Sequence, residues 1–156
     1  MRRRALLCTA ATTLALGACG GGGDEGPTRA EYAKDANAVC RDIERDGKSL
    51  SKASPNTLDE IVTFVDRAER TVKRGMDRLQ KLERPSGEDG KKAKAFVDQL
   101  QRELDTRFLP ALGEMRTAAK AGDVKGLKRA ADKLGKLEST KSDQLARDIG
   151  LDDCAD

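Results

Sequence analysis

Apolar residues recur every three or four positions along most of the chain, and this period predicts amphipathic helices. We predict four of them, over residues 28–52, 57–83, about 90–121 and about 124–149. Turn-forming residues separate these stretches, and the links between them are short. The pattern therefore predicts an all-α fold, specifically an antiparallel four-helix up-down bundle, in which each helix buries its apolar stripe against the others.

The expected helix ends carry capping signals. Two helices begin with Thr followed three positions later by Glu, which is the spacing of a capping box: Thr28 with Glu31, and Thr57 with Glu60. Two helices are predicted to stop at a glycine in the left-handed conformation: Gly122, followed by Asp123 as the next N-cap, and Gly150, followed by Leu151.

Pro110 interrupts the third predicted helix. A proline inside a helix lacks a backbone donor and collides with the carbonyl four residues earlier, here that of Thr106. The apolar stripe continues on both sides of the proline, so we expect a kink at Pro110 and no chain reversal.

Charged residues are spaced for pairing along the helix faces. Acids precede bases by four positions at several places, among them Asp66 with Arg70 and Glu69 with Lys73. Each such pair contributes only ~0.2–0.5 kcal/mol. Their number indicates helix faces exposed to water.

The first eighteen residues have the features of a secretory signal. Arg2, Arg3 and Arg4 form a positive cluster, and residues 5–18 carry no charge. Those fourteen residues would span about 21 Å as a helix, which is too short for a bilayer core of roughly 30 Å.

The end of that apolar stretch is more specific. Leu16, Gly17, Ala18 and Cys19 resemble the bacterial lipobox, in which Leu and two small residues precede an invariant cysteine. The resemblance implies cleavage before Cys19 and attachment of diacylglycerol to its sulfur, with palmitate as a typical acyl chain. It divides the chain into a signal peptide (1–18), a glycine-rich tether (19–27) and a helical domain (28–156). The alternative is an ordinary signal in which the cysteine is incidental.

Cys8 would leave with the signal peptide and Cys19 would carry the lipid, so Cys40 and Cys154 remain. An even pair outside the cytoplasm predicts a disulfide, and the alternative is two free thiols. The geometry poses a difficulty. Cys40 lies about 18 Å into the first helix, whereas the tail after Leu151 reaches back only about 13 Å. Either the first helix overhangs the bundle or the last helix bends or shifts.

Three short segments resemble a group of small actinobacterial lipoproteins: Ala-Asn-Ala-Val-Cys at 36–40, Ala-Gly-Asp at 121–123 and Ile-Gly-Leu-Asp-Asp-Cys at 149–154. Members of that group pair a lipobox with a helical domain that has one cysteine near each end. The resemblance implies a fold and a location at the outer face of the cell membrane, and it implies no catalytic residue.

The charge balance argues against nucleic acid as a partner. The chain has 30 basic and 27 acidic residues, and loss of residues 1–18 would remove three arginines and no acid. A neutral mature chain lacks the basic surface that binds phosphate backbones. Two basic clusters are the exceptions, and they could contact anionic lipid or wall polymers: one comprises Lys91, Lys92 and Lys94, and the other Lys125, Lys128, Arg129, Lys133 and Lys136.

The sequence has no histidine, which removes the commonest general base and metal ligand. We expect no catalytic residue, no metal and no cofactor. The pattern favours a non-enzymatic interaction module of the cell envelope, anchored to the membrane through the Cys19 lipid. Another protein of the envelope is the partner that such a module would bind. The alternative is a carrier that holds a small apolar ligand between its helices.

Overall fold

A computed structural model of the chain describes residues 26–52, 54–137 and 141–155, and within these ranges the secondary structure is entirely helical. The all-α prediction is confirmed. The elements follow in the order α1 (Arg29–Ser51), α2 (Leu58–Lys81), α3 (Gly87–Glu103), the π-helical turn η1 (Leu104–Phe108), α4 (Leu109–Lys120), α5 (Val124–Gly135), α6 (Lys141–Arg147) and the 3₁₀ turn η2 (Asp152–Cys154).

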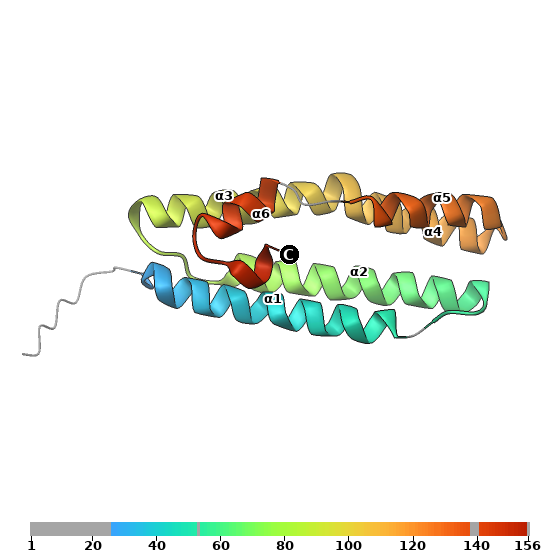
Figure 1. The fold of residues 1–156 in the computed structure, drawn as a ribbon, viewed down its shortest axis with the longest axis horizontal. Coiled ribbons are helices and arrows are strands. Elements are labelled where there is room, and N and C mark those ends of the chain that lie inside the picture. Colours follow the sequence, from blue (N-terminus) through green and yellow to red (C-terminus); the bar gives the residue numbers. More distant parts are fainter. Residues whose placement is uncertain (1–25, 53, 138–140, 156) are drawn as a thin grey trace, which may run out of the picture.

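The helices form two layers (Figure 1). One layer contains α1 and α2, which pack against each other, and the other contains α3 to α6. Contacts of α2 with α3 and α4 join the layers, while α5 packs on α4 and α6 packs on α3. The chain then crosses back, and η2 lies against α1.

The predicted caps are present. The backbone N–H of Glu31 donates to the Thr28 hydroxyl at 3.3 Å, and the Glu31 carboxylate accepts from the Thr28 backbone N–H at 2.9 Å. Thr57 and Glu60 make the same exchange at the start of α2. These reciprocal bonds satisfy backbone donors that the first helical turn leaves unpaired.

Both predicted glycine stops are also confirmed. Gly122 and Gly150 have φ angles of +68° and +79°, in the left-handed region that glycine adopts without steric cost. At the second stop, the Leu151 N–H donates to the Ala146 carbonyl at 2.9 Å and the Gly150 N–H donates to the Arg147 carbonyl at 3.1 Å. These two bonds make a Schellman motif, and they turn Leu151 into the core.

The proline in the third predicted helix follows a π-helical turn. The Leu109 N–H donates to the carbonyl of Leu104, five residues earlier, and Pro110 lies in the first turn of α4. A wider turn before the proline accommodates its ring and its missing donor. The helical path therefore continues from α3 through η1 into α4, and the kink at Pro110 stays a prediction.

The fourth predicted helix is not continuous. It is divided into α5 and α6, with Lys136 and Leu137 outside either helix and residues 138–140 outside the described part of the chain. The prediction of one helix over about 124–149 was wrong. The reason is visible in the sequence: no apolar residue occurs between Leu137 and Leu145, so the apolar stripe does not continue through this stretch.

The hydrophobic core cluster surrounds the first half of α1. Its largest fully buried side chains come from every part of the chain that meets there: Tyr32, Leu79, Phe96, Ile149 and Leu151. The opposite end is more open. Along α5 only Ala130 is buried, and Val124 is 68% exposed. Among the described residues, none of the helices combines the length and apolar character needed to cross a bilayer.

Candidate functional site

Cys19, the predicted site of lipidation, lies outside the described residues, as do the predicted signal peptide and all of the predicted tether except Gly26 and Pro27. The structure describes the attachment point of that tether. Thr28 caps α1, which begins at one end of the described structure (Figure 1).

The other two cysteines are joined. Cys40 and Cys154 form a disulfide across 114 positions of sequence, with their Cα atoms 5.2 Å apart. The Schellman turn resolves the difficulty of reach, because it reverses the chain after α6 and directs η2 onto the middle of α1. The last predicted helix does change course, as one of the two alternatives required.

Hydrogen bonds between α1 and the C-terminal segment surround this disulfide. The Asn37 side-chain amide donates to the Gly150 carbonyl at 3.0 Å and accepts from the Asp153 N–H at 3.1 Å. Arg41 donates to the Asp153 carboxylate at 2.5 Å. The disulfide is therefore surrounded by hydrogen bonds between α1 and the C-terminal segment. Together these contacts hold the C-terminal turn in place.

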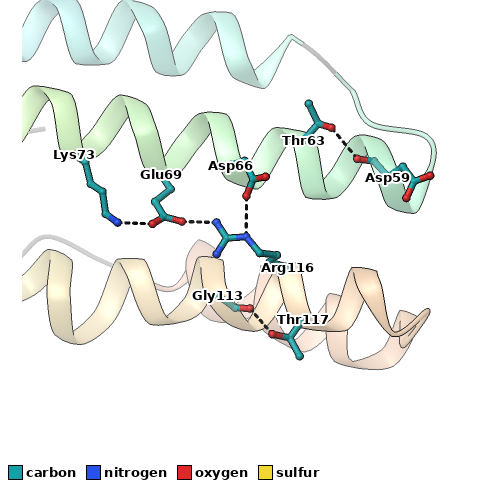
Figure 2. Close-up of polar contacts among 8 residues, drawn as sticks. All are labelled: Asp59, Thr63, Asp66, Glu69, Lys73, Gly113, Arg116 and Thr117. Atoms are coloured by element: carbon teal, nitrogen blue, oxygen red, sulfur yellow. Dashed lines mark hydrogen bonds and ion pairs between the residues drawn. The ribbon is translucent and has the colours of Figure 1, made fainter.

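A charged network between α2 and α4 connects the two layers (Figure 2). The Arg116 guanidinium of α4 donates to Asp66 of α2 at 2.8 Å and also pairs with Glu69 of α2. Lys73 donates to the other oxygen of Glu69 at 2.5 Å. The hydrogen bond from Lys73, and then that from Arg116, lowers the pKa of Glu69, and the two carboxylates raise the pKa of Arg116.

A second polar contact fixes α6. The Glu103 carboxylate, at the end of α3, accepts from the Ser142 hydroxyl at 2.5 Å and from the Ser142 backbone N–H at 3.3 Å. Ser142 is 3% exposed and is the buried polar residue that the core contains within the described ranges. A carboxylate at a helix start satisfies unpaired backbone donors, so this contact anchors α6 to α3.

The acidic side chains of these clusters are engaged in ion pairs and helix caps. Where the structure is described, no three side chains of the metal-ligating kinds converge on one point. Asp66 and Glu69 are neutralised by bases, Glu31 and Glu60 cap helices, and their contacts account for the lowered pKa values of Glu31, Glu60 and Glu69.

Two adjoining hollows follow the line between α1 and α2 near the loop that joins them. The first has a volume of about 390 Å³ and a mostly apolar lining that includes Leu50, Pro55 and Phe64. The second has a volume of about 310 Å³, and its lining includes Arg70 and Arg74. Leu50 and Arg67 line both hollows, so the two form one groove, which we call the hairpin groove.

The three arginines of the hairpin groove are exposed and unneutralised. Arg67, Arg70 and Arg74 have no acidic side chain within 4 Å among the residues that the structure places. The predicted pair of Asp66 with Arg70 is absent, because Asp66 turns to Arg116 instead. Sequence reasoning missed this cluster, although a spacing of three and then four residues places all three arginines along one helix face.

The two basic clusters that the sequence did suggest are partly neutralised. Lys94 pairs with Asp98 at 2.5 Å, Lys133 pairs with Glu114 at 2.6 Å, and Arg129 lies 3.6 Å from Asp123. Comparison with protein families, with curated proteins and with solved structures gave no match, so the interpretation of the hairpin groove depends on its own chemistry.

Proposed function

We propose that this chain is a lipid-anchored, extracytoplasmic helical protein of the bacterial cell envelope, and that it acts as a non-enzymatic interaction module. The observation that carries the proposal is the Leu-Gly-Ala-Cys segment at 16–19, which follows a positive cluster and an uncharged apolar stretch. Two or three acyl chains on Cys19 would give stable anchoring, whereas one would be marginal.

The disulfide between Cys40 and Cys154 supports the extracytoplasmic location, because such bonds persist in oxidising compartments. The glycines at 20–23 support a short flexible tether. Eight residues of such a chain span about 16 Å, so the domain would stay close to the membrane surface. Membership of the small actinobacterial lipoproteins is part of the same proposal.

We describe the domain as an antiparallel four-helix up-down bundle whose fourth helix is broken and whose third is kinked at Pro110. The packing of α1 on α2, of α2 on α4, and of α5 and α6 on the helical path from α3 to α4 supports this description. The sequence has no histidine, and Asp66 and Glu69, the two acids that converge on α4, are both paired with Arg116; this favours binding over catalysis.

Mass spectrometry of the chain from the membrane fraction of its host tests the anchor. We expect a mature chain that begins at Cys19 and carries a diacylglyceryl adduct on that residue. The Cys19→Ser variant is the control, and it should stay unprocessed and lack the adduct. An unmodified thiol at Cys19 in the native chain would refute the proposal.

A further inference from the structure

The hairpin groove combines two chemistries along one line. Towards the loop between α1 and α2, its lining is mostly apolar and includes the half-buried side chains of Leu50 and Phe64. Further along α2 it is lined by guanidinium groups. Arg67 stands at the junction, since it lines both parts. A ligand that follows this groove would meet an apolar surface at one end and positive charge at the other.

The arginines face away from the protein interior. At about 100° of rotation per residue, Arg67, Arg70 and Arg74 lie on roughly the opposite side of α2 from the buried residues Val65 and Met76. Their charges are therefore presented to solvent. Three cations along one helix face repel one another, and an anion between them would relieve that repulsion.

Asp66, the acid that is spaced to neutralise one of these arginines, is engaged elsewhere in the fold. Asp66 precedes Arg70 by four residues, yet its carboxylate accepts from Arg116 at 2.8 Å. Among the groove-lining acids, Asp46 lies 3.9 Å from Arg45, and Glu60 is occupied in the cap of α2. Asp59 and Glu60 line the apolar part, on the loop side of Arg67. The positive part thus has three arginines against Asp46 alone.

We infer that the hairpin groove binds an anionic amphiphile, with a phosphate-type head group on Arg67, Arg70 and Arg74 and an apolar chain over Leu50, Pro55 and Phe64. Arginine forks suit phosphate because two N–H groups donate to two oxygens at once. An apolar wall with a few convergent charges is typical of sites that bind such ligands. The inference deepens the proposed function and rests on it for the source of the ligand, which would be the membrane beside the anchored domain.

Titration calorimetry on the full 156-residue chain tests the inference. The chain would be made cell-free in an oxidising buffer without membranes, so that neither export nor lipid attachment is needed. Its helical circular dichroism spectrum and its lack of free thiol at Cys40 and Cys154 would be checked first. The probe is octyl phosphate below its micelle concentration. Inorganic phosphate tests the head group alone, and octyl glucoside tests the chain alone.

We expect octyl phosphate to bind at least tenfold more tightly than either comparison compound. A variant with Arg67→Gln, Arg70→Gln and Arg74→Gln should lose at least tenfold in affinity, and Arg70→Gln alone should lose about threefold. The matched control neutralises two exposed lysines of α5 and the exposed lysine that follows its last residue, by Lys125→Gln, Lys128→Gln and Lys136→Gln. It removes the same charge from the other layer and should stay within twofold of the native chain.

Four results would overturn the inference: no binding of octyl phosphate, equal binding of inorganic phosphate, equal binding of octyl glucoside, or equal losses in the arginine and lysine variants. The last would mean unspecific attraction by net charge. None of these results depends on Cys19, so the groove and the lipid anchor are judged by separate measurements.

Discussion

Arg116 determines which acidic side chains of α2 remain free to pair with basic side chains of α2. Its guanidinium takes Asp66 and shares Glu69 with Lys73, so it links the layers and leaves Arg70 without its expected neighbour. An interhelical pair of this kind is less exposed than the pairs on the outer faces: the Arg116 side chain is 29% exposed, whereas that of Lys81 is 73% exposed. One residue on α4 thus shapes the charge of a distant face of α2.

Replacing Glu69 by Gln should lower the free energy of unfolding by about 1 kcal/mol at pH 7, since it removes a carboxylate that two cations share. The pKa of Glu69 is lowered in the folded state from its ordinary value of 4.5, mainly by Lys73 and then by Arg116. The contribution is therefore present above that ordinary value and is lost as the pH falls through the folded-state pKa. Urea unfolding of both proteins from pH 7 to pH 3 measures the difference.

Asp77→Asn is the matched control for that experiment. Asp77 also pairs with a lysine four residues later on α2, at 2.6 Å, but it makes no interhelical contact in the described structure. We expect its loss to be at most about 0.5 kcal/mol. Equal losses in the two variants, or a Glu69→Gln difference that persists at pH 3, would contradict a role for the interhelical network.

Gly75 is required by close packing of α1 on α2. A Cβ atom at this position would lie 2.3 Å from Cδ1 and 2.5 Å from Cγ1 of Ile43. Isoleucine is stiff at its first side-chain torsion, so the helices would have to shift. Gly75→Ala should cost about 1–2 kcal/mol despite the better helix propensity of alanine. Gly47→Ala, where no atom lies within 4 Å, should instead stabilise α1 by about 0.5–1 kcal/mol. Thermal unfolding of both variants decides between them, and a stabilised Gly75→Ala would contradict the packing argument.

At the scale of whole elements, α6 depends on its anchor to α3. It is a seven-residue helix, too short to be stable by itself, and the hydroxyl of the buried Ser142, near its start, donates to the Glu103 carboxylate. We expect Ser142→Ala to cost about 1–2 kcal/mol, because it leaves a partly buried carboxylate without one of its donors.

A double-mutant cycle with Glu103→Gln tests that contact. The two substitutions should be less than additive if the residues act on each other, with a coupling of about 0.5–3 kcal/mol. Amide hydrogen exchange in α6 should quicken in each variant, while exchange in α5, which packs on α4, should keep its native rate. If the two losses in the free energy of unfolding were fully additive, Ser142 would contribute through packing and not through its hydrogen bond to Glu103.

The sequence predicted the helical elements and their ends well because those features are local. The capping boxes at Thr28 and Thr57 and the glycine stops at Gly122 and Gly150 each depend on residues within one turn. The division between α5 and α6 was missed, because a weak stripe does not say whether a helix bends or ends. The π-helical turn before Pro110 was also missed, since a kink and a wider turn accommodate the same proline.

The hairpin groove could not have been predicted in the same way. The spacing of Arg67, Arg70 and Arg74 is visible in the sequence, but so is Asp66, which is correctly spaced to neutralise Arg70. Only the approach of α4 shows that Asp66 is engaged elsewhere. The disulfide was predicted from the number and compartment of the cysteines, whereas the turn that brings Cys154 to Cys40 depended on where the last helix breaks.

At the scale of the whole molecule, the Cys40–Cys154 disulfide holds the C-terminal segment against α1. It closes a loop of 114 positions, for which the chain-entropy argument gives roughly 4–5 kcal/mol. Measured values often fall short of this, and here the Asn37 hydrogen bonds and the burial of Ile149 and Leu151 would hold the segment without the bond. Reduction should therefore weaken the fold without abolishing it.

Chemical unfolding of the oxidised chain and of the Cys40→Ala, Cys154→Ala variant measures this effect. We expect the variant to stay helical by circular dichroism and to lose about 2–4 kcal/mol. Exchange should quicken most in residues 148–155, which the bond ties to α1, and least in the contact between α2 and α4. A variant that is random coil would show that the hydrogen bonds around Asn37 cannot hold the turn, whereas an unchanged stability would mean that the disulfide constrains nothing that packing has not already fixed.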